Sequence, residues 1–449
     1  MTVATIYPSK PLDCWPRLME MRRKFARDMW SAKERGELQI IGGTGPMNAL
    51  PVGLGEFHYF GGLGPNFGRI MEDKALLVRC IETAEQAGFG SDTCSTLRAT
   101  LGSMFLGVFD LSRSGERIKA DFALDMQVCQ AQGKTNQLWG EHYGVPCFTI
   151  EVPPFPRQID YLMDQMQEAI EWMEKVTGRT YQDERLIAGV KNEWQCRVLW
   201  ARLCMLQKAI PAPLDQVMLF SLNTVTWRGG RHRKEVVDLY QEVLAETEDR
   251  VKQGIAARPY ESCRLMHEGA ATWYKSGVLR YPRKYGATFM GSHQVFTANG
   301  AYITREDNSL EVGPTLQELG RELRTREEAL RALAELYLRY APGVVGILCL
   351  DSRVTLRVKV YQDWHADAVV FNLDRGCRGT TVGNTETGLL CQKLGIPYMY
   401  YEGNVTNPRE LNEVEYMARM DSLMESLGLR PMEEKLPEEP EIEAGGTGH

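Results

Sequence analysis

The chain has 449 residues, 43% of them hydrophobic, and a formal net charge of −7. This length allows two or three domains with sizeable cores, and the acidic balance argues against a nucleic-acid-binding surface, which needs a basic field. No apolar run reaches the roughly 18 residues of a membrane span. The first residues also lack a basic start followed by an apolar core, so we expect a cytoplasmic protein without a secretory signal or membrane segment.

The N-terminal part divides into an arm and a glycine-rich segment. Residues 1–36 are expected to form a helical arm that packs on the body or on a partner. Residues 37–70 are rich in glycine, which permits tight turns and close approach to a ligand, and we interpret residues 62–68 within them as a plain loop. The stretch 62–68 resembles a nucleotide loop only superficially, because proline stands at 65 and no helix is expected after it.

From about residue 72, helices and strands alternate, which predicts parallel sheets covered on both faces. The first α/β domain is placed at 37–255, with expected helices at 72–88, 94–107, 130–142, 157–209 and 232–253 around the strands ADFALDM and VPCFTIEVP. The second is placed at 256–430, with strands ESCRLMHEG, YGATFMGS, GVVGILCL, ADAVVFNL and PYMYYEGN and helices at 315–339, 352–364, up to Gly395, and 408–427. The acidic tail 431–449 lacks periodicity and is expected to be disordered.

Three of the eleven cysteines stand where a strand or turn passes into a helix: Cys94, Cys129 and Cys377. Ser91 and Asp92 are expected to cap the helix at Cys94. Helix N-termini carry unpaired N–H groups and partial positive charge, which would stabilise thiolates and an anionic cluster. Because ligands of open α/β sheets bind beyond the carboxyl ends of strands, the three thiols would meet in a cleft between the two halves.

Spacing alone leaves several kinds of site open. The three cysteines form no C-x2-C pair of the kind that structural zinc prefers. A thiol nucleophile would need a base such as His142 or His293 nearby, and an iron–sulfur cluster suits three soft thiolates. For most of the other cysteines we expect simple core packing; these are Cys80, Cys147, Cys196, Cys204, Cys349 and Cys391.

Several sequence segments carry a family resemblance that covers residues 40–430. Asp92-Thr93-Cys94 is followed by Arg98, then Cys129, then ADAVVFNLDRGC ending at Cys377, and GIPYMYYEGNVTNPRE contains Glu402 and Arg409. This pattern resembles the benzoyl-CoA reductase / 2-hydroxyacyl-CoA dehydratase family. GFGSDTC with Met104 a helix later looks like the reductase branch, whereas PVGLGEFHYF departs from the Pro-Glu-Glu-Leu-like loop of the dehydratase branch.

The resemblance implies two Rossmann-like (flavodoxin-like) domains that hold one 4Fe-4S cluster through Cys94, Cys129 and Cys377, with one iron left open. It implies a related cluster-bearing sister subunit, a two-subunit ATPase activator with its own cluster, and reduced ferredoxin as the indirect electron source. The expected reaction is the single-electron reduction of the ring of benzoyl-CoA to a cyclohexadiene thioester. A 2-hydroxyacyl-CoA dehydratase subunit, an electron-relay subunit whose sister binds substrate, and a zinc-bound structural protein are the alternatives.

The remaining site residues are expected from their chemistry. Glu56, His58 and His293 are candidate proton donors near glycine-rich turns. WRGGRHRKE offers Arg228 and Arg231, with Arg233 and Lys234, for the phosphates of coenzyme A. Arg98 and Arg378 flank cluster cysteines, where positive charge would tune a cluster's potential.

Overall fold

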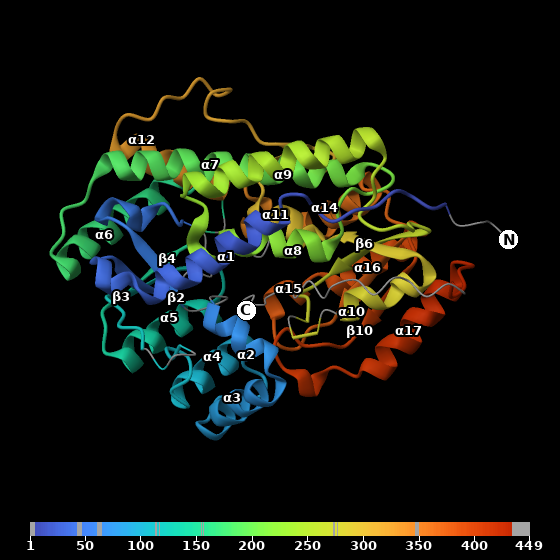
Figure 1. Ribbon diagram of the computed structural model, residues 1–449, viewed down its shortest axis with the longest axis horizontal. Helices are drawn as coiled ribbons and strands as arrows, with labels where there is room; N and C mark the ends of the chain where they lie inside the picture. Colours follow the sequence, from blue (N-terminus) through green and yellow to red (C-terminus); the bar gives the residue numbers. More distant parts are fainter. Residues whose placement is uncertain are drawn as a thin grey trace.

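The structure is a computed structural model in which residues 5–432 are described, apart from 43–46, 61–64, 113–114, 116, 154, 156, 273, 276 and 346–349 and the side chains of 65–67, 227–228, 344–345 and 350–352. Two four-stranded parallel sheets lie side by side, and α7 (Asp183–Met205) and α9 (Lys234–Gln253) run across both (Figure 1). Within the described parts, none of the helices is long and apolar enough to cross a bilayer.

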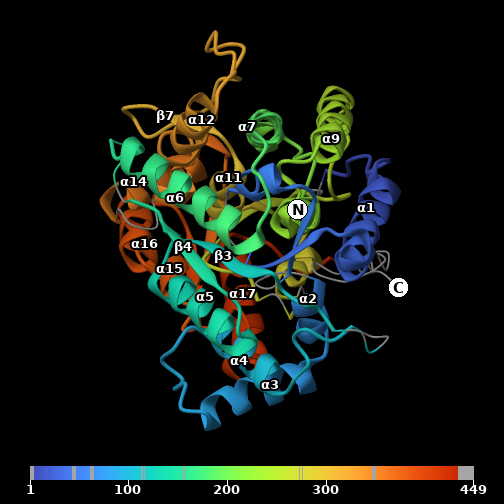
Figure 2. The same cartoon turned by 90° about the vertical axis from the view of Figure 1, so that its left-hand side faces the viewer.

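The first sheet has the strand order β2-β1-β3-β4, and every pair is parallel. Its strands are β1 (Leu38–Gly42), β2 (Phe57–Phe60), β3 (Phe122–Gln127) and β4 (Cys147–Glu151). Successive residues enter opposite cores: Ile40 packs with α6 (Ile159–Thr177), α7 and α12 (Arg326–Leu338), whereas Ile41 packs with α4 (Ser95–Phe105) and α5 (Gln130–Tyr143). Figure 2 shows α6 on one side of β3 and β4 and α5 on the other. Both faces are apolar because both are covered.

The other helices of this half surround that sandwich. They are α1 (Trp15–Trp30), α2 (Pro65–Glu72) and α3 (Lys74–Gln86), whereas α8 (Gln216–Val225) packs in the core of the second sheet. The Asp73 side chain accepts a hydrogen bond from Leu76 N and so caps α3.

The second sheet has the order β10-β9-β5-β6 and is also entirely parallel. Its strands are β5 (Cys263–Glu268), β6 (Ala287–Gly291), β9 (Ala368–Asn372) and β10 (Tyr398–Tyr401). The helices are α10 (Gly277–Arg280), α11 (His293–Asn299), α13 (Pro342–Val345), α14 (Leu350–Asp363), α15 (Arg378–Thr381), α16 (Asn384–Lys393) and α17 (Glu413–Ser426). A short antiparallel pair, β7 (Tyr302–Thr304) and β8 (Leu310–Val312), precedes α12.

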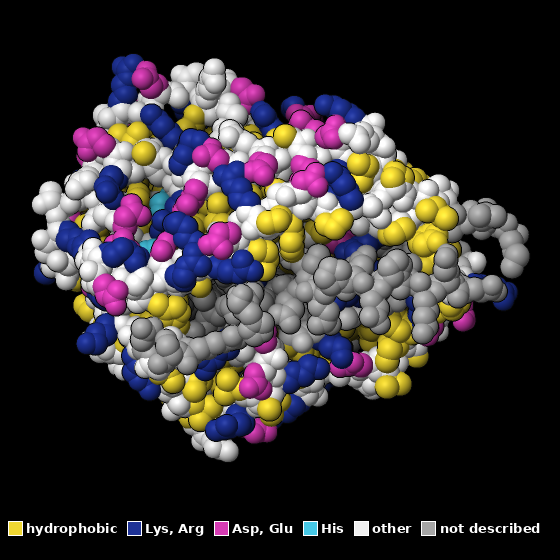
Figure 3. Space-filling view, in the orientation of Figure 1, with side chains coloured by type: hydrophobic (Ala, Val, Ile, Leu, Met, Phe, Trp, Pro, Cys, Tyr) yellow, Lys and Arg dark blue, Asp and Glu magenta, His cyan; other side chains and the backbone are white. Residues whose placement is uncertain are grey.

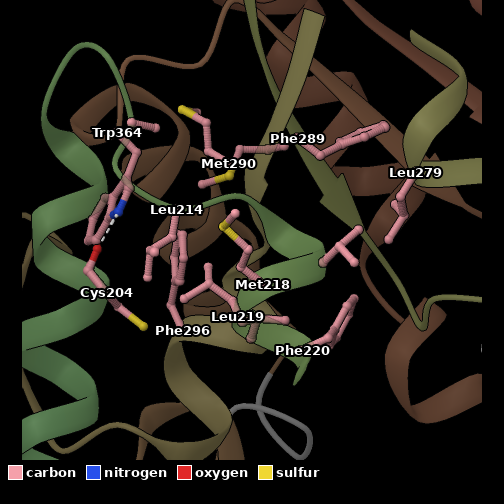
Figure 4. Close-up of a cluster of buried hydrophobic side chains, with 14 of the residues drawn as sticks. Cys204, Leu214, Met218, Leu219, Phe220, Leu279, Phe289, Met290, Phe296 and Trp364 are labelled. Carbon is pink, nitrogen blue, oxygen red and sulfur yellow. Dashed lines mark hydrogen bonds between the residues drawn. The ribbon is translucent and has the colours of Figure 1, made fainter. Parts of the chain in front are cut away.

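A large core joins the second sheet to the helices above it. Met218 and Phe220 of α8 pack against Phe289 and Met290 of β6, and Trp364 donates a hydrogen bond from Nε1 to the carbonyl of Cys204 at 3.0 Å (Figure 4). Helices α8 and α9 therefore contribute to the core of the second sheet, although the sequence assigned them to the first domain. The division at residues 255 and 256 stays a prediction.

The expected α/β fold with two parallel sheets is confirmed, whereas several local predictions are wrong. Strands β1 and β2 were not expected in the glycine-rich segment 37–70. The loop expected at 62–68 is wrong from Pro65 on, where α2 begins, because proline is tolerated in a first helical turn. Helix α8 was missed. The start of the expected strand GVVGILCL is helical in α13, and its residues 346–349 lie outside the described part, as does the tail from residue 433.

Candidate functional site at the junction of the two sheets

Each of the three singled-out cysteines is the N-cap residue of a helix. Cys94 caps α4, Cys129 caps α5 two residues after β3, and Cys377 caps α15 five residues after β9. None of the three side chains forms a full capping hydrogen bond, but, against the effect of burial, first-turn backbone N–H groups lower the pKa of Cys94 and of Cys377. The expectation that Ser91 and Asp92 cap this helix is wrong, because the cap is Cys94 itself.

A direct connection between the two halves fixes Cys94 beside Cys377. The backbone N–H of Ser95 donates to the carbonyl of Gly376 at 3.1 Å. The Ser95 hydroxyl accepts a 2.6 Å hydrogen bond from Thr406 in the loop after β10. Both contacts join residues about 280 to 310 positions apart, and each involves the immediate neighbour of a cysteine. The first half therefore delivers Cys94 to the carboxyl edge of the second sheet.

Asp374 shapes the turn that presents Cys377. Its Oδ1 accepts from the backbone N–H of Gly376 at 2.7 Å and of Cys377 at 3.2 Å. Burial raises the pKa of this carboxyl to about 7, although the backbone N–H groups act in the opposite direction. Asp374 was not singled out from the sequence. The signal was available, since an Asp followed two residues later by Gly is typical of an Asx turn.

The thiols lie close enough to influence one another. Burial raises the pKa of Cys94, and the charge of Cys129 raises it further, whereas the backbone N–H groups of Leu97 and Thr96 lower it. Burial likewise raises the pKa of Cys377 to about 12, and the charges of Asp374 and Cys94 add to the rise. Three thiolates gathered in this way need a positive partner to be stable together.

Three helix-capping thiols are soft donors of the kind that an iron–sulfur cluster takes. Across the part of the chain that the structure describes, no three His, Cys, Asp or Glu side chains come together as they would around one metal ion. A four-iron cube spreads its thiolate ligands over separate irons, which sets the sulfur atoms farther apart than the ligands of one ion. The helix N-termini behind each sulfur supply the N–H donors that suit an anionic group.

Arg98 lies in a charged network behind Cys94. It is fully buried and donates to Glu85 at 2.6 Å, and it lies 3.7 Å from Glu410 of the second half. Arg409 donates to the same Glu85 carboxylate at 2.7 Å. Arg98 therefore ties the halves together as well as adding positive charge near Cys94. Arg378 is exposed at the start of α15 and makes no ion pair with the residues described.

The structure does not bring Glu56 and His58 to this junction. Glu56 immediately precedes β2, and His58 lies in β2 with its Nε2 2.8 Å from Glu37 Oε2. Because β2 runs parallel to β1, Glu56 lies at the amino end of the sheet, opposite the edge from which Cys129 follows β3. Burial lowers the pKa of His58 despite the carboxylate beside it.

The basic run around α9 divides between surface and interior. Glu56, Arg185, His232, Arg233 and Lys234 line an open surface groove of about 470 Å³. Positive and negative side chains are mixed over this face of the molecule (Figure 3). Arg231 is 4% exposed and points inward, with its backbone N–H donating to Asn48 Oδ1 at 3.3 Å. The side chain of Arg228 lies outside the described residues.

His293 lies at the carboxyl edge of the second sheet, directly after β6. Its backbone N–H donates to Glu268 at 2.9 Å, and neither ring nitrogen has a hydrogen-bond partner in the described structure. Burial holds its pKa well below the usual range, and the charges of Arg357 and Arg353 lower it further. Arg353 donates to the carbonyl of Gly379, which places His293 and the Cys377 loop around one pair of arginines.

The other cysteines mostly follow the core expectation. Four of those expected in the core are buried; these are Cys80, Cys196, Cys204 and Cys391. Cys14 and Cys263, for which nothing was predicted, are buried as well. Cys147 is exposed, so that expectation is wrong for it. It occupies the first position of the edge strand β4, where one face of the strand reaches solvent. Cys349 lies outside the described residues.

The fold and site define a class: an α/β protein with two parallel sheets whose carboxyl edges share three helix-capping thiols. Residues 74–427 match the family described as 2-hydroxyglutaryl-CoA dehydratase, D-component, and the chain belongs to that family. The recognised family resemblance is thereby confirmed.

Three relatives show the breadth of this family. The chain is 25% identical to the alpha subunit of lactoyl-CoA dehydratase of Anaerotignum propionicum over 90% of its own length and 94% of the relative's. It is 25% identical to the alpha subunit of (R)-2-hydroxyglutaryl-CoA dehydratase of Acidaminococcus fermentans over 67% and 58%. It is 22% identical to a subunit of the benzoyl-CoA reductase of Thauera aromatica over 76% and 78%. All three are named as one subunit of their enzymes.

Proposed function

We propose that this chain is the cluster-bearing subunit of an ATP-dependent benzoyl-CoA reductase, holding one 4Fe-4S cluster through Cys94, Cys129 and Cys377. The observation that carries the proposal is the convergence of these thiols: each caps a helix, and the Ser95 to Gly376 hydrogen bond joins the loops of two of them across the halves. Three thiolates leave one iron of such a cube without a protein sulfur.

When bound, the cluster would supply single electrons of low potential and a Lewis-acidic iron next to the thioester. The chain's own residues do the rest. Against the effect of burial, backbone N–H groups in the first turns of α4 and α15 lower the pKa of Cys94 and Cys377 and so favour the thiolates. Asp374 orients the Cys377 turn through Gly376 N and Cys377 N, and Arg98 adds a positive charge on the side of Cys94.

Of the three proton-donor candidates, we retain His293. Its ring is neutral near pH 7 because its pKa lies well below the usual value, so one ring nitrogen carries a proton and the other accepts one. Both nitrogens are free of partners among the described residues, and the ring lies at the same sheet edge as Cys377. A neutral imidazole in this position suits the relay of protons to a ring that gains negative charge.

The partners follow from the names of the relatives and from the resemblance. Because each relative is one subunit of a larger enzyme, we expect a related cluster-bearing sister subunit. We further expect a two-subunit ATPase activator with its own cluster, fed by reduced ferredoxin, in the cytoplasm. The aromatic ring resists electron uptake, so an energy source such as ATP hydrolysis is needed to drive it.

Two observations favour different substrates. GFGSDTC and the departure of PVGLGEFHYF from the dehydratase pattern favour the reductase, as does the match to a subunit of benzoyl-CoA reductase. The match to the alpha subunit of lactoyl-CoA dehydratase, which spans 94% of that relative, favours a 2-hydroxyacyl-CoA dehydratase subunit as the second candidate.

One anaerobic experiment decides between them. The chain is purified with its sister subunit and combined with activator, ATP and reductant, and benzoyl-CoA and lactoyl-CoA are supplied in separate assays. We expect ATP-dependent formation of a cyclohexadiene thioester from benzoyl-CoA and no acryloyl-CoA from lactoyl-CoA. Turnover of lactoyl-CoA alone would establish the second candidate, and a complex without iron or visible absorption would exclude both.

A further inference from the structure

Two buried arginines in the interior lack a carboxylate partner. Arg197 on α7 is 1% exposed, and Arg231, which follows the π-helical turn η4 (Thr226–Gly230), is 4% exposed. Among the described residues, neither forms an ion pair within 4.0 Å. Buried charges are costly and are normally paired. By contrast, Arg98 and Arg258 are buried and paired with carboxylates.

The two side chains make few hydrogen bonds, and several of their N–H donors have no acceptor among the described residues. Arg231 donates to Asn299 Oδ1, and Arg197 donates to the carbonyl of Ala298 at 3.5 Å and lies 4.4 Å above the Tyr337 ring. Five buried nitrogen atoms have no partner among the described residues; they are Arg197 Nε and Nη2, Arg231 Nε, Asn48 Nδ2 and Asn299 Nδ2. All five are donors, so the missing group is an acceptor.

These donors belong to one neighbourhood. Arg231 bonds both asparagines, through its backbone to Asn48 and through its side chain to Asn299. Burial raises the pKa of the Tyr337 hydroxyl, and the charges of Arg197 and Arg231 both oppose that rise, which places both guanidinium groups around one phenol.

The carboxylate of Glu193, which also acts on Tyr337, already has two hydrogen-bond partners. Glu193 accepts from the backbone N–H of Ala49 at 2.9 Å and from the Tyr337 hydroxyl. The neighbouring residues 43–46, which are not described, read Gly-Thr-Gly-Pro and carry no acidic side chain.

The location points to substrate. Asn48 lies just beyond the carboxyl end of β1, and Asn299 ends the helix that starts at the carboxyl end of β6. Those are the sheet edges from which the cysteine loops and His293 also emerge. A π-helical turn directly precedes Arg231, and such turns are frequent at functional sites.

We propose that Arg197 and Arg231, with Asn48 and Asn299, form a buried binding site for an oxyanion of the substrate. Two unpaired guanidinium groups and two amide N–H₂ groups complement an oxygen that carries full or developing negative charge. The inference rests on the proposed function for its ligand, a coenzyme A thioester. That ligand offers two sources of such oxygen: the thioester carbonyl, which becomes negative as the ring accepts an electron, and the phosphates of coenzyme A.

Binding without turnover separates the sources. The anaerobic complex, without activator, is titrated calorimetrically with benzoyl-CoA, with free coenzyme A and with S-benzoylpantetheine, which lacks the phosphates. Arg231→Met is expected to weaken benzoyl-CoA binding by roughly ten- to a hundredfold, the effect of losing hydrogen bonds to a charged group. If the variant also binds S-benzoylpantetheine more weakly but binds coenzyme A as tightly as wild type does, the bound oxygen is the thioester carbonyl. The reverse pattern assigns the phosphates.

The Tm of the complex distinguishes a ligand-binding arginine from one that serves only to stabilise the fold. Arg231→Met removes a buried charge with few partners, so the Tm of the complex is expected to stay the same or rise. Arg250 is the matched control: it is 1% exposed but donates to the carbonyls of Lys10 and Pro11 at 2.8 and 2.6 Å. Arg250→Met should lower the Tm and leave all three affinities unchanged.

The remaining outcomes are equally decisive. Unchanged affinity of Arg231→Met for all three ligands would overturn the proposal. Failure of the variant complex to assemble would also overturn it, because the Arg231 charge would then be needed for folding. Arg231→Lys, which keeps the charge but not the planar fork, should retain part of the affinity. If wild type binds lactoyl-CoA and not benzoyl-CoA, the reductase proposal fails, and the same comparison with lactoyl-CoA still tests the oxyanion site.

Discussion

Gly376 is the point at which the loops of Cys94 and Cys377 touch, and Gly376→Ala tests whether that contact holds the site together. A Cβ at this position would lie 2.5 Å from Asn404 Oδ1 and closer still to Ser95 Oγ, whereas ordinary contacts begin at 3.4 Å. One of the two loops must therefore move by about an ångström. Overpacking of this kind costs roughly 1–3 kcal/mol. Loss of the Ser95 to Thr406 hydrogen bond adds about 1 kcal/mol.

Together these effects should lower the free energy of unfolding by about 2–4 kcal/mol, and the loops of Cys94 and Cys377 should move apart. Two measurements on anaerobically purified protein check it: iron per chain, and the midpoint of thermal or urea unfolding. Gly277→Ala is the matched control, because its nearest neighbour is the flexible Lys275 Cε at 3.5 Å. It should retain wild-type iron content and stability.

A double-mutant cycle localises the effect. Ser95→Ala removes the oxygen that the new methyl group meets first, so Gly376→Ala should cost less in the Ser95→Ala background than in wild type. Simple additivity of the two changes would show that the loops do not meet as described. Wild-type iron and stability in Gly376→Ala alone would refute the reasoning outright.

Three further predictions address the ligands, the proton path and the charged interior. Cys129→Ala should lose iron and activity while Cys196→Ala, buried in the core, keeps both; equal iron in the two would contradict the ligand assignment. His293→Gln should lower kcat about 100-fold with little change in the affinity for benzoyl-CoA, and an unchanged kcat would exclude the relay. Asp215→Asn removes the carboxylate between Arg258 and Arg283 and should cost about 3 kcal/mol in urea unfolding at pH 7.

The dependence of the unfolding free energy on pH, measured below pH 7, gives a second test of Asp215. Burial would raise the pKa of this carboxyl, but the charges of Arg258 and Arg283 outweigh it and hold the pKa below its ordinary value of 3.8. A carboxylate with a depressed pKa contributes its stability above the unfolded value and loses it as the pH falls below about 4. The difference between wild type and Asp215→Asn should therefore shrink below pH 4, and a constant difference down to pH 2 would be inconsistent with this assignment.

Local patterns in the sequence predict the parts of the site that depend on local structure. The alternation of strands and helices indicates two parallel sheets, and each of the three cysteines stands at the start of a helix, as its flanking residues suggest. These features follow from periodicity and from the end of a strand, both of which are encoded within about 15 residues. The density of glycine in residues 37–70 concealed β1 and β2, since β1 ends at Gly42 with a φ of 135°.

The parts that could not be predicted depend on which segments meet in space. Glu56 and His58 were candidates because they lie near glycines, but the direction of β2 places them at the far end of the sheet. The hydrogen bond between Ser95 and Gly376 joins residues 281 positions apart, and nothing in either segment specifies the other. Asp374 and Glu193 are ordinary acidic residues in the sequence, and their partners become evident once the loops are placed.

The junction combines two opposite ways of treating buried polar groups. Around the cysteines, Gly376 N and Cys377 N reach Asp374, Ser95 reaches Thr406, and Arg98 reaches Glu85, so that loop is held in one geometry. Elsewhere in the interior, Arg197 and Arg231 keep donors that find no acceptor among the described residues, which lowers stability. Donors that folding leaves without acceptors favour the binding of a ligand that supplies them, because binding then satisfies groups that folding left unpaired.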